Sequence, residues 1–471
     1  SQGRQPFTLW AILRNIVFYI PPVLGSAFIL LLSFVAMLVP AKKSSRQAAI
    51  GWMLHRACRI LIGYAAFIHP KRIGPDGELI RSWNGEAGVI VANHQSSLDI
   101  IMILATFPKV KFMVADWVLT SPLFGVISRF LGYYSRSEGY EKSLERLRVD
   151  VADGWCLAVF PEGTRSLNGK IKRFHKGAFY LASQVGVPVI PVVFYGNWRI
   201  APKNQGFNMT EGIAVTEVMA PVSTISAEYH ELTIRISSLV KAEYAELCRK
   251  YDSPVNPYFR KALVSSYIYK GPVTEWYVKV KTKMENSYSF FHSVLPREGR
   301  ITDIGCGMGQ MDFMLSMYCP ERRIIGIDYD ADKIAVAQNS WLLKNLPDLE
   351  FRCGNASECE LPESNAFVIS DMLHYLDPQA QEALIRRCAE KLLPGGMILV
   401  RDSDSENAKG QKVTALSEVF STRILAFNRT QGELNFISHS RMETIASTVG
   451  LKMTVRSNDA VTSNTFYTLK F

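Results

Sequence analysis

The sequence predicts two consecutive α/β domains that follow an apolar N-terminal segment. Three observations support this fold class. Residues 16–41 carry no charge, residues 85–225 alternate short apolar runs with helical stretches, and the same alternation restarts after the prolines in 251–259. Because 48% of the 471 residues are hydrophobic and 20% are charged, the composition excludes a disordered chain and allows full hydrophobic cores.

The N-terminal segment has the composition of a membrane anchor. Pro21-Pro22 splits the uncharged run and leaves Val23–Val39, a stretch at the short limit of about 20 residues for a spanning helix. A second stretch, roughly 46–68, mixes apolar residues with arginines, which suits an interfacial helix. We expect residues 1–68 to form membrane-anchoring helices, either as one span or as a hairpin in one leaflet. A cleaved signal peptide is not expected, because the apolar stretch is too long and no small-residue cleavage site follows it.

The charge distribution separates the two parts of the chain. Residues 1–270 have a net charge of +13 and residues 271–471 a net charge of −3. A basic part can bind nucleic acid, anionic lipid headgroups or phosphorylated substrates. Since the basic part also holds the longest apolar segment, we expect membrane lipids and no nucleic acid as partners. The eight cysteines include no C-x-x-C pair, so we expect no metal site and reduced thiols in a cytosolic compartment.

The first α/β domain is expected over residues 69–250. Its predicted buried strands are GVIVA (88–92), CLAVF (156–160) and PVIPVVF (188–194), and an amphipathic helix over 227–250 closes it. Asn93-His94-Gln95-Ser96-Ser97-Leu98-Asp99 follows the first of these strands. An Asp99 carboxylate that accepts from one ring nitrogen of His94 leaves the other nitrogen to take a proton from a hydroxyl group. Alone this pair is weak evidence, because a histidine near an aspartate more often has a structural role.

Three further blocks strengthen the catalytic interpretation. They are Gly132-Tyr133-Tyr134-Ser135-Arg136, Phe160-Pro161-Glu162-Gly163-Thr164-Arg165-Ser166 and Val189-Ile190-Pro191-Val192-Val193. Together with the histidine block, their order and spacing over about residues 45–225 resemble the 1-acylglycerol-3-phosphate acyltransferase family, the glycerolipid acyltransferases.

The resemblance implies roles for the residues of these blocks. His94 resembles the general base that deprotonates an acceptor hydroxyl, and Asp99 resembles its orienting partner. The resulting alkoxide would attack an acyl thioester, either acyl-carrier protein or coenzyme A. Arg136 and Arg165 resemble phosphate-binding arginines, whose planar forks grip pairs of oxygens. Three residues of the block Phe160–Ser166, which is the third block when the histidine block is counted first, are expected to shape the acceptor site: Glu162, Gly163 and Thr164.

The same resemblance implies a place in the cell and a pathway. The family's apolar N-terminal helices hold the active site at a bilayer, and they correspond here to residues 9–68. We therefore expect an enzyme of phospholipid biosynthesis on the inner (cytoplasmic) membrane, with its catalytic domains facing the cytoplasm and acyl carrier protein as a possible partner.

One block departs from the family pattern. Asp116 and Trp117 stand roughly where a lysine and a glutamate usually precede the Pro-x-x-Gly element, here Pro122 to Gly125. Replacing a cation by an anion beside a phosphate pocket weakens phosphate binding. The sequence thus favours an acceptor other than lysophosphatidic acid, such as a hydroxylated amino-acid lipid or another specialised lipid.

The C-terminal part, residues 251–471, predicts a Rossmann-like, doubly wound parallel sheet behind N-terminal linker helices. RITDIG, RIIGID, LEFRCGN, AFVISD and MILVRD are short apolar runs, each followed by a helix-like stretch. Gly305, Gly307 and Gly309 form a turn after the first run, and Asp328 ends the second, where an acid grips ribose hydroxyls. At this level the ligand is either a dinucleotide or S-adenosylmethionine.

The details of the motif favour S-adenosylmethionine. Asp303, two residues before the first glycine, and the Leu392–Gly396 turn resemble the class I S-adenosylmethionine-dependent methyltransferases over about residues 258–471. The resemblance implies S-adenosylmethionine as cofactor, with Asn355 near the adenine and Asp371 in the cofactor site. His374 either accepts a proton from the methyl acceptor or is a packed helix residue.

Together these patterns predict a bifunctional, membrane-associated lipid enzyme. It would join an O-acyltransferase to a methyltransferase that acts on a small or lipid acceptor. The alternative is an active acyltransferase whose C-terminal domain only binds S-adenosylmethionine or serves as a scaffold.

Overall fold

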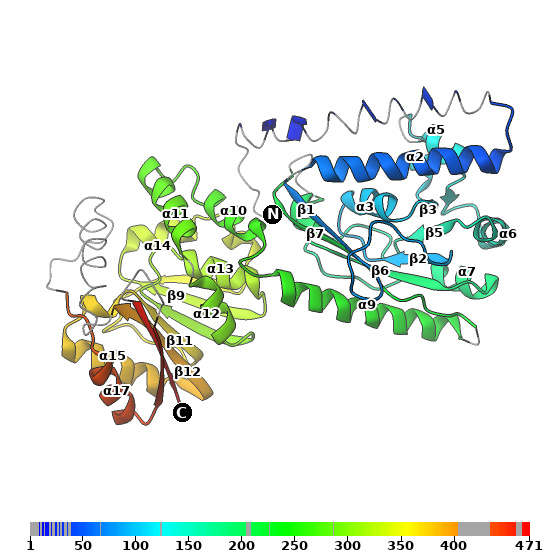
Figure 1. The fold of residues 1–471 in the computed structure, drawn as a ribbon. Helices are drawn as coiled ribbons and strands as arrows, with labels where there is room; N and C mark the ends of the chain where they lie inside the picture. The colour runs from blue at the N-terminus through cyan, green and yellow to red at the C-terminus, as the bar shows by residue number, and fades with distance from the viewer. Residues whose placement is uncertain are drawn as a thin grey trace. The chain divides into compact units, whose positions relative to one another are not determined.

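A computed structural model describes most of the chain, in two compact units (Figure 1). The described residues are 39–65, 67–122, 125–203, 209–225, 227–285, 287–403, 434–457 and 464–471, with single positions between 9 and 35. The first unit is built mainly from residues 7–251 and the second mainly from residues 259–471. Both are α/β units, so the predicted fold class is confirmed for the two domains.

The first unit contains a seven-stranded sheet in the order β1-β7-β6-β2-β5-β3-β4. Paired strands are parallel except β6 and β7, which run antiparallel. The strands are β1 (Ile68–Ile73), β2 (Val89–Ala92), β3 (Val110–Val114), β4 (Tyr134–Ser135), β5 (Cys156–Val159), β6 (Val189–Tyr195) and β7 (Gly212–Val218). The helices are α2 (Lys43–Tyr64), α3 (Leu98–Thr106), α4 (Asp116–Thr120), α5 (Gly125–Leu131), α6 (Tyr140–Ala152), α7 (Gly177–Val185), α8 (Asn197–Ile200) and α9 (Tyr229–Tyr251).

Strand β2 explains why its sequence is a continuous apolar run. Ile90 and Ala92 enter the core on one face of the sheet, with residues of α2 and α3. Val89 and Val91 enter the core on the other face, with residues of α6, α7 and α9. Side chains alternate between the faces of a strand, so a central parallel strand covered on both sides is apolar at every position.

The N-terminal segment exposes apolar side chains. Its described positions are helical, and the Oδ1 atom of Asn15 accepts a hydrogen bond from the backbone N–H of Met209 at 3.0 Å. Large apolar residues at helical spacing are 43% to 74% exposed: Leu9, Ile12, Leu13, Ile16, Val17, Ile20, Leu24, Phe28, Leu31 and Val35. Within the described part of the chain, no helix has both the length and the apolar character needed to cross a membrane.

The second unit contains a seven-stranded sheet in the order β10-β9-β8-β11-β12-β14-β13. The strands are β8 (Gly299–Ile304), β9 (Arg322–Asp328), β10 (Leu349–Cys353), β11 (Ser364–Ser370), β12 (Leu392–Ser403), β13 (Lys452–Ser457) and β14 (Asn464–Lys470). Strands β8 to β12 pair in parallel, and β14 is antiparallel to both of its neighbours. The chain order reverses between β8 and β11, which is where ligands bind in doubly wound sheets.

Helices surround this sheet and precede it in the chain. The linker helices are α10 (Pro257–Ser265), α11 (Pro272–Met284) and α12 (Tyr288–Val294). The sheet's own helices are α13 (Gln310–Tyr318), α14 (Ala331–Gln338), α15 (Pro378–Glu390) and α17 (His439–Thr448), with 3-10 turns η1 (Leu343–Asn345) and η2 (Leu373–Tyr375). Alternate strand residues again fill the core, which includes Ile304, Phe367, Ile369, Ile398 and Val400.

Candidate active sites

The first site begins at the carboxyl end of β2, where His94 and Asp99 meet. The Nδ1 atom of His94 lies 2.8 Å from Oδ2 of Asp99, which is fully buried, whereas the His94 side chain is 15% exposed. Oδ2 also accepts hydrogen bonds from the backbone N–H groups of Gln95 at 2.6 Å and Ser96 at 2.8 Å. A carboxylate at Nδ1 requires that nitrogen to carry the proton. The Nε2 atom of His94 is then the nitrogen able to accept one.

The aromatic ring of Phe160 fixes the plane of the imidazole. The two rings stack with centroids 3.9 Å apart and planes 16° from parallel. Phe160 lies at the end of β5, which pairs with β2, so the parallel register brings the histidine block and the third block together.

Glu162 joins two loops around His94. Its Oε1 accepts from the backbone N–H of His94 and its Oε2 from that of Lys172, both at 2.8 Å. The backbone N–H of Ser166 donates to the carbonyl of His94 at 2.7 Å. Burial raises the pKa of Glu162, while the two backbone donors oppose that shift. Both oxygens therefore hold the loops of the site, and the expected role of Glu162 in shaping the acceptor site stays a prediction.

Arg136 lies against the turn that follows Glu162. A Cβ atom placed on Gly163 would be 3.9 Å from Nη2 of Arg136 and 3.8 Å from the ring of His175. The hydroxyl of Thr164 accepts from Nζ of Lys203 at 3.0 Å, and Arg165 is half-buried in the same turn. The structure thus brings Arg136 to Gly163, and it adds two residues that the sequence patterns did not identify, His175 and Lys203.

Asp116 belongs to the block that departs from the family pattern. Its Oδ1 accepts from the hydroxyl of Ser137 at 2.9 Å and also from that of Ser135. These hydroxyls lower the pKa of Asp116, and the charge of Arg136 lowers it further. An ionised carboxylate therefore stands beside the arginine expected to bind phosphate.

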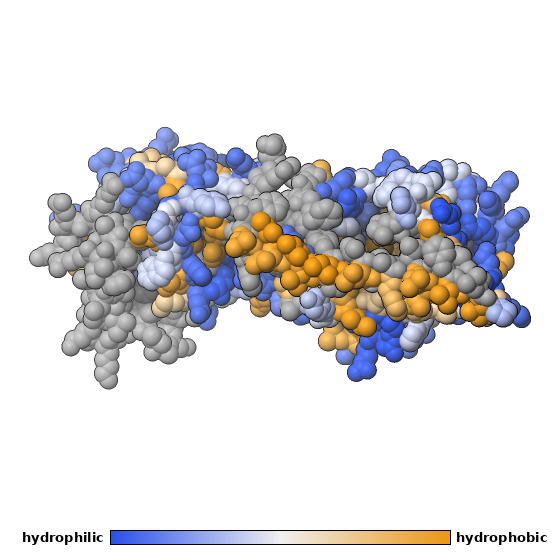
Figure 2. Space-filling view, turned by 90° about the horizontal axis from the view of Figure 1, so that it is seen from above, coloured by the Kyte–Doolittle hydropathy of each residue, from blue (hydrophilic) through white to orange (hydrophobic). Residues whose placement is uncertain are grey.

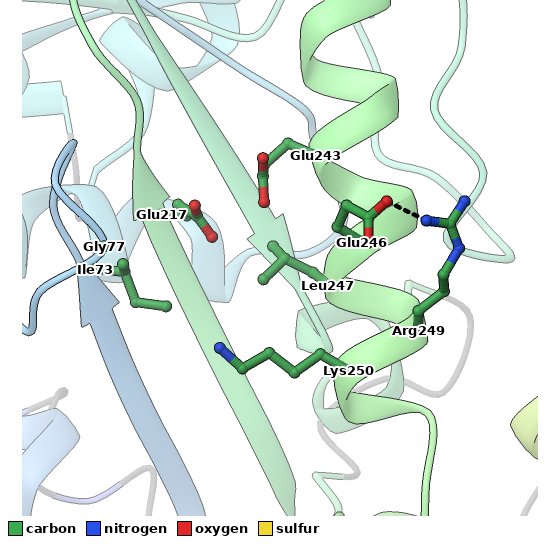
Figure 3. A pocket seen from close by; sticks show the side chains of 8 residues that line it. All are labelled: Ile73, Gly77, Glu217, Glu243, Glu246, Leu247, Arg249 and Lys250. Carbon is green, nitrogen blue, oxygen red and sulfur yellow. Dashed lines mark hydrogen bonds and ion pairs between the residues drawn. The ribbon is translucent and has the colours of Figure 1, made fainter. Parts of the chain in front are cut away.

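A cavity of about 430 Å³ in the same unit lies apart from these residues (Figure 3). It is lined by Ile73, Gly77, Glu217, Glu243, Glu246, Leu247, Arg249 and Lys250. Burial, followed by the charge of Glu243, raises the pKa of Glu217 to about 7. None of the expected site residues lines the cavity, so we do not assign it to the acyltransferase site.

The second site lies at the carboxyl ends of β8 and β9. Gly305 and Gly309 both have positive φ, 83° and 76°. A Cβ on Gly305 would lie 2.8 Å from Met372, and one on Gly309 would lie 2.3 Å from Phe351, so neither position accepts a side chain without rearrangement. Asp328 accepts from the backbone N–H of Gly307 at 2.7 Å through Oδ2, which ties the glycine turn to β9.

Asp328 and Asp303 can each serve a ligand. Oδ1 of Asp328 accepts from the backbone N–H of Asp330 at 2.9 Å, and a carboxylate oxygen has room for a second donor. Oδ1 of Asp303 is buried and, apart from the neighbouring carboxyl of Asp312, has no hydrogen-bond partner among the described residues. An ammonium group and a ribose with two hydroxyls supply the donors that these oxygens lack, so the residues present fit S-adenosylmethionine.

Asp312 was not identified from the sequence. It lies in the first turn of α13 and is completely buried. Burial raises the pKa of Asp312 well above its usual range, and the charge of Asp303 raises it further. We infer that Asp312 is protonated when Asp303 is ionised. The sequence signal that could have identified Asp312 is its position as an acidic residue directly before the largely apolar stretch FMLSMY.

The other expected residues lie at the same end of the sheet. Asn355 is exposed after β10, and its side chain accepts from the backbone N–H of Ser357 at 3.0 Å, as in an Asx turn. Asp371 follows β11 with φ of 55°, and its Oδ1 lies 3.5 Å from Nε of Arg401. The contacts of these residues with a cofactor stay predictions.

His374 is buried beside Asp402. Its Nδ1 lies 2.7 Å from Oδ1 of Asp402, and its backbone N–H donates to Oδ2 at 3.2 Å. The rings of Tyr375 and Phe436 lie 4.3 Å and 5.3 Å from the imidazole, measured between centroids. The histidine is thus both packed and oriented by a carboxylate, an arrangement that suits a base as well as a core residue.

Comparison with known proteins assigns a domain type to each unit. Residues 76–195 match the family model described as acyltransferase, and residues 301–396 match the model described as methyltransferase domain. The predicted fusion of these two domain types is confirmed.

Curated relatives match the first unit. A chloroplastic 1-acyl-sn-glycerol-3-phosphate acyltransferase of Brassica napus is 36% identical over 118 residues, covering 24% of this chain and 34% of that protein. The human beta form of the enzyme is 27% identical over 223 residues, covering 45% and 76%. The chain spans between 34% and 47% of the length of the first four such relatives.

Solved structures are similar to each unit at low identity. The 1-acyl-sn-glycerophosphate acyltransferase of Thermotoga maritima is 24% identical with a TM-score of 0.44, covering 51% of this chain and 96% of that one. Human N-acetylserotonin methyltransferase is 17% identical with a TM-score of 0.34, covering 44% and 58%.

Proposed function

We propose that this chain, an acyltransferase domain followed by a methyltransferase domain, is a bifunctional enzyme that modifies lipids. The first domain would move an acyl chain from a thioester to the hydroxyl of a lysolipid-type acceptor. The second would transfer a methyl group from S-adenosylmethionine to a small or lipid acceptor. The observation that carries the proposal is the 2.8 Å contact of His94 with buried Asp99 inside the part that matches the acyltransferase family.

The geometry supports general-base catalysis of acyl transfer. The acceptor hydroxyl gives its proton to Nε2 of His94, and the resulting alkoxide attacks the thioester carbonyl. The tetrahedral intermediate collapses with loss of a thiolate, which takes the proton from the imidazolium. Asp99 stabilises that imidazolium and keeps Nδ1 protonated. Acyl-carrier protein and coenzyme A both fit as donors.

Arg136 and Lys203 are proposed to bind the charged part of the acceptor or donor. Both lie at the Gly163-Thr164 turn, next to the loop that Glu162 ties to His94. A planar guanidinium can grip two oxygens of a phosphate or carboxylate. The carboxylate of Asp116 beside Arg136 disfavours a doubly charged phosphate, so we propose an acceptor that is not lysophosphatidic acid.

The methyltransferase site is proposed to hold S-adenosylmethionine, which supplies an electrophilic methyl group. Asp328 would bind the ribose hydroxyls, Asp303 the ammonium group, and Asn355 the adenine edge. His374, held by Asp402, would accept the proton of the methyl acceptor, since a carboxylate at Nδ1 leaves Nε2 as the nitrogen able to accept one.

Membrane attachment is proposed through the exposed apolar face of the first unit. Figure 2 shows apolar side chains gathered in a long band on this face. The described apolar positions between 9 and 35 are exposed, and α2 also exposes Trp52 (54%), Ile60 (71%) and Tyr64 (55%). The guanidinium of Arg56 lies 5.1 Å from the Trp52 ring centroid, so a cation accompanies the apolar residues. This combination suits the interface of a membrane with anionic lipids, and we place the protein on the cytoplasmic face of the inner membrane.

The proposal is tested by assaying both reactions on one preparation. The purified full chain is incubated with radiolabelled acyl-coenzyme A or acyl-carrier protein, or with methyl-labelled S-adenosylmethionine, and a panel of lysolipids and hydroxylated lipids. His94→Ala should reduce acyl transfer by roughly 10²-fold or more while methyl transfer remains. Asp328→Ala should do the reverse. Near-normal acyl transfer by His94→Ala would contradict the first assignment, and cofactor binding without methyl transfer to any lipid would favour a binding or scaffold role for the second domain.

A further inference from the structure

Asn197 makes direct contact with the carboxylate of Asp99. Its Nδ2 donates to Oδ1 of Asp99 at 2.7 Å, and neither residue is exposed to solvent. Oδ2 of the same carboxylate accepts from His94, Gln95 and Ser96. The two oxygens therefore have different partners. Oδ2 is held by the histidine loop, and Oδ1 by a side chain 98 residues away in the sequence.

The fold fixes the turn that carries Asn197. Gly196 has φ of 84°, and a Cβ there would lie 2.0 Å from the carbonyl oxygen of Ile213, so only glycine fits. The amide of Asn93 donates to the carbonyl of Phe194 at 3.0 Å and accepts from its N–H at 2.7 Å. These two hydrogen bonds hold the end of β6 against the end of β2.

A second bond holds the far end of the same turn. The hydroxyl of Ser96 donates to the carbonyl of Ala201 at 2.8 Å. Helix α8, which begins at Asn197, is thus attached at both ends to the loop between His94 and Asp99. Its position relative to the carboxylate is set by the sheet register and not by the Asn197 contact alone.

We propose that Asn197 is a positioning residue of the acyl-transfer reaction, acting on His94 through Asp99. The inference rests on the proposed function of the first domain and adds a third member to its catalytic pair. A buried carboxylate needs donors on both oxygens, and loss of one leaves an oxygen unpaired. Without the amide, Asp99 could turn about its Cβ–Cγ bond, so His94 would lose its fixed tautomer and orientation.

Two substitutions separate positioning from a merely structural role. Asn197→Ala removes the donor. Asn197→Asp keeps the shape, but its carboxyl can donate to Oδ1 of Asp99 only while it is protonated. Relative to wild type, Asn197→Asp should therefore lose activity as pH rises, whereas Asn197→Ala should be lowered by a similar factor at every pH. Asn256→Ala is the matched control, because Asn256 is equally buried but bonds to Ile213 and the hydroxyl of Tyr195.

The experiment measures kcat and KM of the full-length variants between about pH 6 and pH 9, normalised to folded protein by circular dichroism. We expect Asn197→Ala to lower kcat by roughly tenfold or more with little change in KM, and Asn256→Ala to stay within about twofold of wild type. Rates of both Asn197 variants within about twofold of wild type at every pH would overturn the inference. So would losses that follow only the loss of folded protein, with no pH dependence for Asn197→Asp. If His94→Ala is itself active, the proposed function fails instead, so the two failures are distinguishable.

Discussion

The backbone N–H of His94 donates to the side chain of Glu162 at 2.8 Å, across 68 residues of sequence. The second oxygen of Glu162 holds the backbone of Lys172 at the same distance. One buried carboxylate therefore joins the histidine loop to the loop that carries several basic residues. Each oxygen of the glutamate has a backbone partner, so Glu162 holds the two loops of the site together.

Substituting Glu162 should therefore disturb the site more than a change of charge alone. Glu162→Ala removes both acceptors and should lower acyl transfer by roughly 10²-fold, the scale expected when a catalytic group is displaced by about 1 Å. Glu162→Gln keeps one acceptor and should lose less. Initial rates and thermal unfolding of both variants check this. Glu141→Gln, in α6, is the surface control, and equal rates for Glu162→Ala and wild type would contradict the assigned role.

Replacing Asp116, which stands where the acyltransferase family usually has a cation, should change the enzyme's preference among acceptors. Asp116→Lys removes the acceptor of the Ser135 and Ser137 hydroxyls and restores a cation beside Arg136. We expect the ratio of kcat/KM for lysophosphatidic acid to that for an uncharged lysolipid to rise about tenfold, which corresponds to about 1.4 kcal/mol. Competition between the two acceptors in one reaction measures the ratio directly. Asp116→Asn should give a smaller change of the same sign, and an unchanged ratio in both variants would remove Asp116 from the acceptor site.

The sequence predicted the buried strands well and the edge strands poorly. Strands β2, β5 and β6 are apolar throughout because helices cover both faces. Strands β2 and β5 lie within the expected runs, and β6 extends one residue past its run, to Tyr195. Strand β1 has the sequence IHPKRI and β13 has KMTVRS, and neither shows a long apolar run. Both lie at an edge of their sheet, where one side lacks a neighbouring strand and polar side chains are tolerated.

The site was predictable only where its residues are close in sequence or follow a recognisable strand. His94 and Asp99 are five residues apart, so one turn of chain brings them together. The contact of Asn197 with Asp99 depends on the order of β6 and β2 in the sheet, which no local pattern reveals. Asp312 had the appearance of an ordinary polar helix residue, and only the burial of its helix makes it unusual.

Membrane attachment should depend on the exposed side chains of α2. Trp52→Glu with Ile60→Glu places two charges on the proposed membrane face without touching the buried face of the helix. In flotation with vesicles that contain anionic lipid, the double variant should shift from the vesicle fraction toward the soluble fraction. High salt alone should not release the wild type, because screening removes only the electrostatic part of the binding. Exchanging exposed Val149 of α6 for glutamate is the control, and equal flotation of all three proteins would refute this surface.

The neighbouring carboxyl groups of Glu217 and Glu243, shown in Figure 3, should make the first unit less stable at alkaline pH. Because the pKa of Glu217 is raised to about 7, its folded form binds a proton more tightly than its unfolded form does. This contribution to stability is present at acidic pH and is lost as pH rises through about 7. Glu217→Gln should therefore raise the unfolding temperature relative to wild type at about pH 8.5 and change it little at about pH 5. Glu246→Gln, whose carboxylate pairs with Arg249, should show no such pH dependence. The same difference at both pH values for Glu217→Gln would exclude the pair as its source.

Asp328 should control both the binding of S-adenosylmethionine and the order of the glycine turn. Its carboxylate already holds the N–H groups of Gly307 and Asp330, so only its remaining lone pairs serve the ribose. Asp328→Ala removes the ribose acceptors and also releases Gly307, and binding should weaken by about 2–3 kcal/mol, or roughly 30- to 150-fold. Asp328→Asn can still accept from one N–H and one hydroxyl, so it should lose less. Isothermal titration of the full-length variants measures both affinities, and nicotinamide dinucleotides serve as the competing ligand class.

Because burial raises the pKa of Asp303, the affinity of the wild type should also increase as pH rises from acidic to neutral, when that carboxylate becomes ionised and can pair with the ammonium group. Tight dinucleotide binding without a signal for S-adenosylmethionine would contradict the cofactor assignment, whereas a pH-independent affinity would contradict only the role of Asp303.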